Sequence, residues 1–322
     1  MNDSEIDKAV AILRAGGLVA FPTETVYGLG ADAANPEAVR KLYAAKGRPD
    51  YHPVIVHLAG IAQLPEWVRE VTPAAQKLAQ KFWPGPLTLI LKRKPGVGDA
   101  VTGGQETIGV RIPAHPLAHA LLEKFGGGIA APSANRFGHV SATTAQHVKQ
   151  EFGDSVDFVL DGGQSEVGIE STIVDVTGAR PVLLRPGHIS AHAIEQAVGE
   201  PLAAPHVQSP RAPGMLATHY APYTPMLIIT SDLIHEQAEN TAKQGKRVAV
   251  LALSPLRRRQ TGLEWVTAPR AAVAYAHQLY ANLRVLDALG CAVILVEQPP
   301  RAADWAAVND RLDRAAAGSR LP

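Results

Sequence analysis

Two cations flank a glycine early in the sequence, Lys46 and Arg48, and Pro49 follows them directly. Because proline disfavours a helix at the residue before it, this stretch is expected to be an irregular, solvated loop. Cations held two positions apart on such a loop can converge on one polyanion, whereas on a helix they would diverge. A phosphate-binding loop is one interpretation and a basic turn in solvent is the other. The pair taken alone favours the second.

Hydroxyl-rich turns follow several of the apolar runs that are expected to form strands. The first, Phe21–Gly30, contains Thr23, Glu24, Thr25 and Tyr27 beside two glycines. A hydroxyl cap within a turn explains one threonine, but it does not explain four polar groups. Open α/β sheets bind ligands at loops after buried strands, so these groups are candidate ligand contacts. Turns of the same character lie at Ser133 and Asn135, at Ser141, at Ser171 and at Arg185.

One cation lies inside an apolar strand pattern rather than on a turn. Arg111 belongs to the run Ile108–Ile112. Burying an arginine is costly unless it is paired, so Arg111 should face a fixed anion, either a structural carboxylate or a ligand. Together with the polar turns, these cations predict a polar site for an anionic ligand.

The common nucleotide, metal and hydrolase signatures are absent from the sequence. No GxxxxGK[ST] segment occurs, and the glycines at 126–128 precede a strand pattern instead of following one. Neither a Walker-type loop nor a dinucleotide-binding turn is therefore indicated. The histidine pairs 115/119 and 188/192 lack the glutamate of HExxH, and the single cysteine, Cys291, excludes an internal disulfide and a cysteine zinc site. A GxSxG elbow is also missing.

These residues must be positioned by a fold that alternates strands and helices. Of the 322 residues, 46% are hydrophobic and 19% are charged, and the formal net charge is +1. That charge argues against a dedicated nucleic-acid binder but leaves room for a weak RNA contact. Strands are expected at 18–21, 54–58, 87–91, 108–112, 128–131, 158–160, 172–176 and 182–184, with helices after Ser4 and Asn35 and at 73–82, 116–125 and 144–152. Several strands follow one another too closely for helical crossovers, so the sheet is expected to be mixed.

A proline-rich segment divides the chain. Residues 201–225 contain six prolines and a single charge, Arg211, and are expected to form a stiff, extended linker. We predict a catalytic domain over 1–200, a linker or lid over 201–225 and a smaller domain over 226–322. In the smaller domain, strands at 226–229, 248–253 and 292–296 alternate with helices at 233–243, 271–289 and 303–315, which predicts a three-layer α/β unit.

Seven segments within the first 190 residues resemble the YrdC-like threonylcarbamoyl-AMP synthase family. They are FPTETVYGLGADA, KLYAAKGRPDYHPVIVHL, FWPGPLTLIL, IGVRIPAHP, APSANRFG, GIESTIVDV and LLRPGHI, and they occur in the family's order. The linker's Pro213-Gly214-Met215 and His219-Tyr220-Ala221-Pro222 are similar to the family's longer, two-domain form. The resemblance implies a twisted open α/β sheet with a ligand cleft.

The resemblance also implies a reaction and a set of site residues. The reaction joins L-threonine, bicarbonate or carbon dioxide, and ATP into L-threonylcarbamoyl-adenylate with release of pyrophosphate, and the product serves threonylcarbamoylation of the tRNA adenosine next to the anticodon. Downstream tRNA-modification proteins are the implied partners, and Mg²⁺ is implied to be carried by the ATP phosphates. By motif, threonine is implied to contact Thr23, His57, Arg111 and Ser171, with Arg111 facing its carboxylate. Lys46 and Arg48 are the implied catalytic, phosphate-holding residues, and the nucleotide is also implied to contact Thr107, Ser133, Asn135, Ser141, Arg185 and Tyr220.

Two further expectations concern the linker and His52. Met215, His219 and Tyr220 are large groups on the linker, so we predict that it folds over the site and shields a labile product from water. His52 stands where the family usually has an amide, and a ligand contact there would be pH-sensitive because imidazole titrates near neutrality.

Two other function classes stay open on the sequence alone. One is a nucleotide- or RNA-binding module without turnover. The other is a carbamoyl transferase of the hydrogenase-maturation type, whose zinc-finger-like cysteines are not matched by a chain with one cysteine. The charged start and the lack of any apolar run near the ~18 residues that span a bilayer predict a cytoplasmic protein without a membrane partner.

Overall fold

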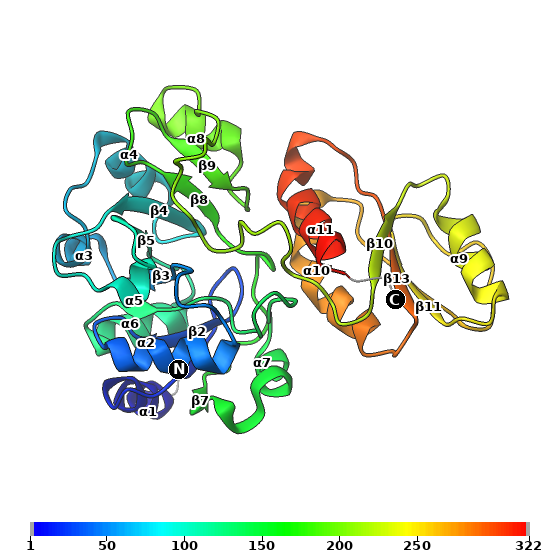
Figure 1. Ribbon diagram of the computed structural model, residues 1–322, viewed down its shortest axis with the longest axis horizontal. Coiled ribbons are helices and arrows are strands. Elements are labelled where there is room, and N and C mark those ends of the chain that lie inside the picture. The colour runs from blue at the N-terminus through cyan, green and yellow to red at the C-terminus, as the bar shows by residue number, and fades with distance from the viewer. Residues whose placement is uncertain (1–2, 320–322) are drawn as a thin grey trace. The chain divides into compact units, whose positions relative to one another are not determined.

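The chain divides into two compact units. The computed structural model describes residues 3–319 and is drawn in Figure 1. The first unit comprises the residues up to Phe137 together with Ala142–Met215, and the second comprises Gly138–Ser141 and the residues from Leu216 onward. The predicted linker, 201–225, is thus divided between the units at Met215.

The first unit is built on a mixed sheet, as predicted. Its strands are β1 (Val19–Phe21), β2 (Gly28–Asp32), β3 (Ile55–His57), β4 (Leu87–Lys92), β5 (Thr107–Arg111), β6 (Ile129–Ala130), β7 (Phe158–Val159), β8 (Thr172–Asp175) and β9 (Val182–Arg185). They are ordered β7-β1-β2-β6-β3-β5-β4-β8-β9. The pairs β1–β7, β3–β5 and β4–β8 are parallel, and the other neighbours are antiparallel.

Helix ends in the first unit follow local capping chemistry, and α2 is the informative case. Asn35 caps its start by accepting from the backbone N–H groups of two residues in the first turn, and Gly47 ends it in the left-handed region at φ 62°. Lys46 is therefore the last residue of a helix, so the expectation of an irregular loop was wrong for this residue. Pro49 restricts only the residue before it, which lies beyond the glycine cap. The helices are α1 (Asp3–Arg14), α2 (Pro36–Lys46), α3 (Leu64–Trp67), α4 (Pro73–Phe82), α5 (Asp99–Thr102), α6 (Pro116–Phe125), α7 (Ala145–Phe152) and α8 (Ala191–Val198).

The two faces of the strands β3, β5, β4 and β8 are covered differently. On one face, side chains such as Val56, Val110 and Val174 form a large apolar core with α2, α3, α4 and α8. On the other face, Ile55, Ile90 and Ile173 form a small cluster with β9 and with residues of the 203–215 segment. Since side chains alternate along a strand, His57 and Arg111 share this second face, and both stand at the end of their strand. The second face is therefore the one that carries the candidate site.

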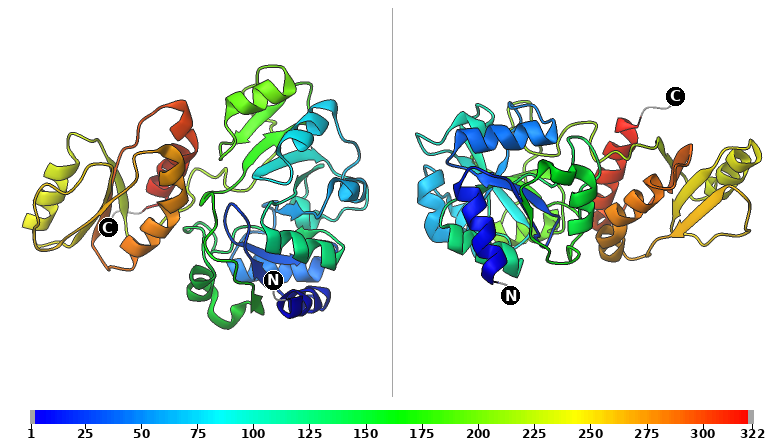
Figure 2. Two further views of the ribbon diagram at one scale, coloured as in Figure 1. Left: turned by 180° about the vertical axis from the view of Figure 1, so that it is seen from behind. Right: turned by 90° about the horizontal axis from the view of Figure 1, so that it is seen from below.

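The second unit is a three-layer α/β structure, as predicted. Its strands β10 (Met226–Ile229), β11 (Val248–Ala252), β12 (Leu263–Thr267) and β13 (Val293–Glu297) are all parallel and are ordered β10-β13-β11-β12. The sheet lies between α9 (Ile234–Lys243) on one side and α10 (Ala272–Asp287) and α11 (Ala306–Gly318) on the other, as the views of Figure 2 show.

Sequence reasoning missed some elements, most notably β2. This strand occupies the end of the segment that was read as a polar turn, because two glycines in five residues disfavour a strand. Packing explains the second glycine: a Cβ at Gly30 would lie 2.9 Å from ring or methyl carbons of both Phe21 and Ile129. The edge strand β12 and the helices α3, α5 and α8 were also not predicted.

Candidate active site

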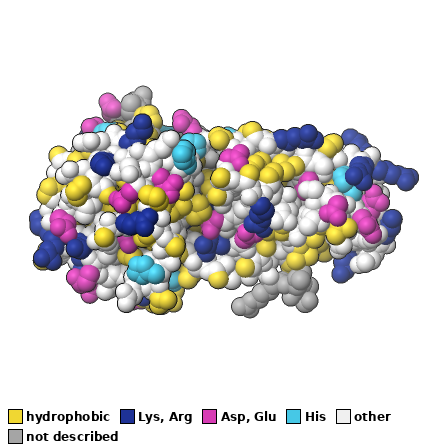
Figure 3. Space-filling view, turned by 90° about the horizontal axis from the view of Figure 1, so that it is seen from above, with side chains coloured by type: hydrophobic (Ala, Val, Ile, Leu, Met, Phe, Trp, Pro, Cys, Tyr) yellow, Lys and Arg dark blue, Asp and Glu magenta, His cyan; other side chains and the backbone are white. Residues whose placement is uncertain are grey.

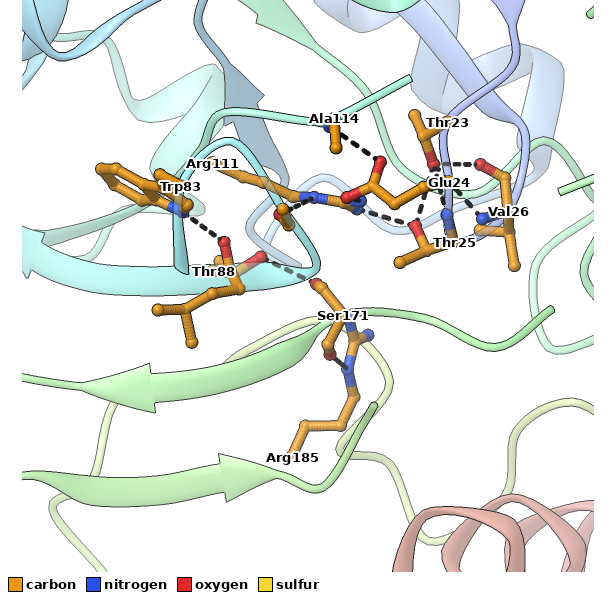
Figure 4. Close-up of polar contacts among 12 residues, drawn as sticks. Thr23, Glu24, Thr25, Val26, Trp83, Thr88, Arg111, Ala114, Ser171 and Arg185 are labelled. Atoms are coloured by element: carbon orange, nitrogen blue, oxygen red, sulfur yellow. Dashed lines mark hydrogen bonds and ion pairs between the residues drawn. The ribbon is translucent and has the colours of Figure 1, made fainter. Parts of the chain in front are cut away.

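Arg111 is held by a carboxylate from the first polar turn (Figure 4). Its Nη2 lies 2.7 Å from Glu24 Oε1, its Nη1 donates to Thr25 Oγ1 over 2.8 Å, and its Nε donates to the Gly85 carbonyl over 3.3 Å. The other oxygen of Glu24 accepts from the backbone N–H of Ala114 at 3.1 Å. Arg111 and Glu24 are both buried. Of the two anions that the sequence left open for Arg111, the structure therefore contains the structural carboxylate.

The hydroxyl of Thr23 makes its hydrogen bonds within the turn in which it lies. Its hydroxyl donates to the Val26 carbonyl over 2.6 Å and lies 2.9 Å from Thr25 Oγ1. It also accepts from the backbone N–H of Val26 at 3.3 Å. Because Thr25 also accepts from Arg111, a continuous set of hydrogen bonds joins the guanidinium to this turn. The turn is thereby fixed in place beside the end of β5.

Arg185 and Ser171 join two neighbouring strand ends. The Nε and Nη2 of Arg185 donate to the Ser171 carbonyl and hydroxyl, both at 3.1 Å. The Ser171 hydroxyl also lies 2.8 Å from Thr88 Oγ1 on β4. Figure 4 shows Arg111 and the Thr88–Ser171–Arg185 series in one region of the first unit. Two of the predicted cations thus lie in the same region of the fold.

Lys46 is bonded to the segment that carries Ser133 and Asn135. Its Nζ donates to the Ser133 carbonyl over 2.6 Å and to the Asn135 carbonyl. Only 2% of Lys46 is exposed. Burial holds the pKa of Lys46 well below its usual range, and the charge of Arg48 acts in the same direction. An anion bound next to this amine would raise that pKa again.

Arg48 is a buried cation framed by aromatic rings. Its guanidinium carbon lies 5.9 Å from the centre of the Tyr43 ring and 5.6 Å from that of Phe137, and its Nη2 donates to the Pro53 carbonyl. Only 8% of Arg48 is exposed, so the expectation of a solvated basic turn was wrong. The intervening Gly47 reverses the chain, which allows Lys46 and Arg48 to be buried together.

His52, the departure from the family pattern, lies in the same surroundings. Its ring is 5.4 Å from the Phe137 ring, and its carbonyl accepts from Tyr43 Oη at 2.6 Å. Burial lowers the pKa of His52, and the charges of Arg48 and Arg211 lower it further. The ring is therefore neutral at pH 7.

His57 is a neutral, buried imidazole at the end of β3. Burial lowers the pKa of His57 to about 3, and the neighbouring charge of Arg111 contributes to the shift. Its ring lies edge-on to Phe21, with centroids 6.1 Å apart. At neutral pH this side chain can donate or accept a hydrogen bond without adding charge to the site.

Three predicted nucleotide residues lie away from these groups or in the other unit. Thr107 begins β5 and Arg111 ends it, so the two are about 13 Å apart along the strand. Ser141 and Tyr220 belong to the second unit. Tyr220 is buried and is the non-glycine residue with a left-handed backbone among residues 3–319, at φ 63°.

The first part of the predicted linker packs on the sheet face that carries the site. Ala212 and Met215 join the apolar cluster of Ile55, Ile90 and Ile173. The segment is also anchored by polar contacts: Arg185 Nη1 donates to the Pro213 carbonyl over 2.9 Å, Arg211 donates to the Gly103 carbonyl, and the backbone of Arg211 bonds to Gln105 in both directions. Residues 203–215 thus form a cover over this face, which we call the covering segment.

Within residues 3–319, no group of three or more His, Cys, Asp or Glu side chains could hold a metal ion. None of the helices in that range is both long and apolar enough to span a bilayer. On the face drawn in Figure 3, Lys and Arg side chains are interspersed with Asp and Glu.

A large mixed sheet with buried arginines at the ends of β5 and β9, together with a smaller parallel α/β unit, defines a two-domain α/β protein. Two family models match the chain in succession. One, described as "Telomere recombination", covers residues 11–187, and the other, described as "Threonylcarbamoyl-AMP synthase, C-terminal domain", covers residues 189–317.

Curated relatives match over nearly the whole chain. The chain is 39% identical to the threonylcarbamoyl-AMP synthase of Pyrococcus abyssi, over 100% of this chain and 96% of the relative, and 41% identical to that of Bacillus subtilis, over 98% and 94%. It also resembles the crystal structure of P. abyssi Sua5 complexed with L-threonine, with a TM-score of 0.92 and 38% identity over 99% of this chain and 96% of the other. The chain belongs to the threonylcarbamoyl-AMP synthase family, in its two-domain form.

Sequence reasoning counted Glu24 and Thr25 among the candidate ligand contacts without pairing them with Arg111, and it assigned no role to Thr88, which lies beside Ser171. A signal for Glu24 was available, because it lies in the polar turn and Arg111 required a fixed anion. Thr88 gave a weaker signal: it is the hydroxyl in an apolar strand and shares a face with Ile90.

Proposed function

We propose that the site of the first unit synthesises L-threonylcarbamoyl-adenylate from L-threonine, bicarbonate and ATP, with release of pyrophosphate. The observation that carries this proposal is the set of buried cations on the family's motifs. Lys46, Arg48, Arg111 and Arg185 are each at most 8% exposed. Burying several positive charges in one unit is costly, and an anionic ligand offsets that cost.

The reaction requires such cations more than it requires a protein nucleophile. Condensation of the threonine amine with bicarbonate gives a carbamate and releases water. A carbamate oxygen then attacks the α-phosphorus of ATP, and the bond to the β-phosphate oxygen breaks to release pyrophosphate. Both reactants are anions, so the barrier contains charge repulsion and the negative charge that develops on the leaving group. Preorganised cations lower both contributions.

Lys46 and Arg48 are the proposed phosphate ligands. The two hydrogen bonds given for the Lys46 amine are with backbone carbonyls, which carry no net negative charge. An ammonium group has three N–H donors, so one remains for a phosphate oxygen. Mg²⁺ would enter as part of the ATP complex and supply further charge neutralisation.

Arg111 is the proposed ligand of the threonine carboxylate. A guanidinium carries five N–H groups, and the contacts with Glu24, Thr25 and Gly85 use three of them. The other two can bind a carboxylate without disrupting the buried pair. Thr23, His57 and Ser171 are proposed to contact the same substrate, and Thr107, Ser133, Asn135, Ser141, Arg185 and Tyr220 to contact the nucleotide.

The covering segment is proposed to act as a lid. A mixed anhydride hydrolyses readily, so its site must exclude water. Arg211 lies within this segment, and its peptide bond is a trypsin site. We expect ATP plus threonine to slow cleavage at Arg211. Equal cleavage with and without the two ligands would show that the covering segment does not close over them and is a static spacer.

The product is chemically labile, so a transferase that uses it promptly is the expected partner. We propose that this partner belongs to the tRNA-modification machinery of the cytoplasm and transfers the threonylcarbamoyl group to the adenosine next to the anticodon. The formal net charge of +1 favours a small-molecule role over direct RNA capture.

A pyrophosphate-release assay with single omissions tests the proposal. The full mixture should release pyrophosphate, and omission of threonine, of bicarbonate or of ATP should abolish the release. Binding of ATP without threonine-dependent release would instead support a nucleotide-binding module.

A further inference from the structure

Two segments that carry proposed nucleotide residues are held by the helices of the second unit. These are residues 138–141, which end in Ser141, and residues 216–224, which include Tyr220. We infer that Arg284 on α10 and Arg311 on α11 are positioning residues for nucleotide binding, because they hold the segments that carry Ser141 and Tyr220. This inference rests on the proposed function.

One face of α10 supplies three of the contacts. Tyr280, Arg284 and Asp287 are spaced by four and three residues, which places them on the same side of a helix. Tyr280 stacks on Tyr220 with ring centroids 5.8 Å apart. The carboxylate of Asp287 accepts from the backbone N–H groups of the two residues at 223 and 224, over 2.9 and 2.7 Å.

Arg284 holds the segment 138–141 by its backbone. Its Nε donates to the Ser141 carbonyl over 3.2 Å, and its Nη2 donates to the Val140 carbonyl. Ser141 and Val140 are both buried, whereas Arg284 is half-buried. Since a guanidinium is planar, bonds to two successive carbonyls fix the orientation of the peptide as well as its position. The backbone of Ser141, from which its hydroxyl projects, is thereby held in one orientation.

Tyr220 needs support because its backbone is strained. A left-handed conformation is unfavourable for a residue with a Cβ and persists where surrounding contacts impose it. Arg311, whose side chain is fully buried, lies with its guanidinium carbon 5.2 Å from the centre of the Tyr220 ring. The face of the ring opposes a cation, and Tyr280 also stacks on it. These contacts come from two helices and select one conformation.

Arg311 pairs with a carboxylate on the same helix. Asp310 accepts from Arg311 Nη1 at 2.7 Å and from Arg314 Nε at 3.0 Å. Arg314 in turn donates to the Leu216 carbonyl, and its own carbonyl accepts from the His219 N–H at 3.3 Å. Helix α11 therefore contacts the segment 216–224 at Leu216, His219 and Tyr220. The contact with Tyr220 is made by Arg311.

Arg284→Met in the full-length protein is the primary test, because Arg284 is half-buried and methionine keeps the apolar stem. Arg301→Met is the matched control: this arginine of the same unit pairs with the exposed Asp313 and contacts neither segment. We expect the KM for ATP to rise about tenfold in Arg284→Met, which corresponds to about 1.4 kcal/mol. The KM for threonine should stay within about twofold, and Arg301→Met should match the wild type.

Two further measurements are recovery of ATP affinity by a conservative substitution and direct binding of an ATP analogue. Arg284→Lys, which keeps donors for the two carbonyls, should recover part of the ATP affinity. Binding of a non-hydrolysable ATP analogue, measured by calorimetry, is independent of turnover. Loss of analogue affinity in Arg284→Met supports the inference even if the wild type makes no product, an outcome that would contradict the proposed function alone.

Two results would overturn the inference. One is an unchanged KM for ATP and an unchanged analogue affinity in Arg284→Met. The other is an equal rise in the KM for ATP and for threonine, because that would indicate a general loss of structure. Arg311→Lys adds an independent check on the tyrosine contact: it should weaken analogue binding while leaving the thermal unfolding midpoint near that of Arg301→Met, and full analogue affinity would remove Arg311 from the set.

Discussion

Buried charges determine how single substitutions will act on this protein. Arg111 and Glu24 form a close pair with little exposure, so each neutralises the other in a region where an isolated charge is costly. Removing one partner of such a pair costs about 3–5 kcal/mol, whereas removing both costs much less. A stability measurement must therefore accompany every activity measurement at these positions.

Arg111→Ala is expected to destabilise the fold by about 3–5 kcal/mol, and the added change Glu24→Gln should recover part of that loss. In the folded fraction, the KM for threonine should rise more than the KM for ATP, and Arg111→Lys should recover little because a point charge does not replace the planar fork. Urea unfolding and steady-state kinetics measure the two effects. A larger loss of ATP affinity would assign Arg111 to the nucleotide.

Lys46→Ala is expected to reduce adenylate formation about ten- to hundredfold, since a charge-assisted contact with phosphate contributes about 1.5–3 kcal/mol. The change also leaves two buried carbonyls without their donor, so a loss of about 1–3 kcal/mol in unfolding free energy should accompany it. Pyrophosphate release and thermal unfolding report the two results. Lys149→Ala, at an exposed lysine on α7, is the control, and wild-type turnover in Lys46→Ala would refute the phosphate assignment.

His57 gives the protein a pH-dependent stability. The unfolded chain takes up a proton as the pH falls through 6.5, but the folded chain does not until about pH 3. Stability should therefore decrease as the pH falls across this window, by at most about 1.4 kcal/mol per pH unit. Urea unfolding between pH 7 and 5 should show this slope in the wild type and in His192→Gln, and a smaller one in His57→Gln. Parallel profiles for all three would exclude His57 as the cause.

At the scale of elements, sequence patterns predicted most strands and helices because apolar runs and capping residues are local signals. They did not predict that α2 extends to Lys46: Gly47 is a local helix-stop signal, but it was assigned with Pro49 to an irregular loop, and the burial of both cations is not visible in the sequence. Strand β2 depends on tertiary packing. Its two glycines favour a turn in the sequence, and the contact of Gly30 with Phe21 and Ile129, which leaves no space for a side chain, appears only in the folded structure. The candidate site shows the same limit, because pairing of Arg111 with Glu24 joins residues 87 positions apart.

The covering segment makes a testable contribution to the first unit. Ala212 and Met215 cover Ile55, Ile90 and Ile173, and these contacts are lost if the chain ends at residue 200. We expect a chain of residues 1–200 to be less stable than one of residues 1–215 by about 2–3 kcal/mol, because apolar surface becomes exposed. It should also make less product or release it faster. Thermal unfolding of the two chains decides the point, and identical midpoints would show that the segment contributes nothing to the fold.

At the scale of the whole molecule, the two units have different tasks. The first unit holds two buried cations at strand ends and two at the end of α2, and the second unit holds residues 138–141 and 216–224 through α10 and α11. No sequence pattern indicated that four residues from the middle of the first domain would group with the second. That arrangement arises from long-range contacts, such as those of Arg284 with the Val140 and Ser141 carbonyls and of the Ala221 N–H with the Gly138 carbonyl, which a linear pattern does not encode.

Isotope incorporation shows directly whether this protein makes L-threonylcarbamoyl-adenylate. The purified protein is incubated with ATP, L-threonine and ¹³C-labelled bicarbonate, and the nucleotide products are analysed by mass spectrometry. We expect an adenylate that carries both threonine and one ¹³C atom, in an amount that matches the pyrophosphate released, and we expect its loss in Lys46→Ala. Pyrophosphate release without a ¹³C-containing adenylate, or an adenylate that forms when threonine is omitted, would show that the protein does not catalyse this reaction.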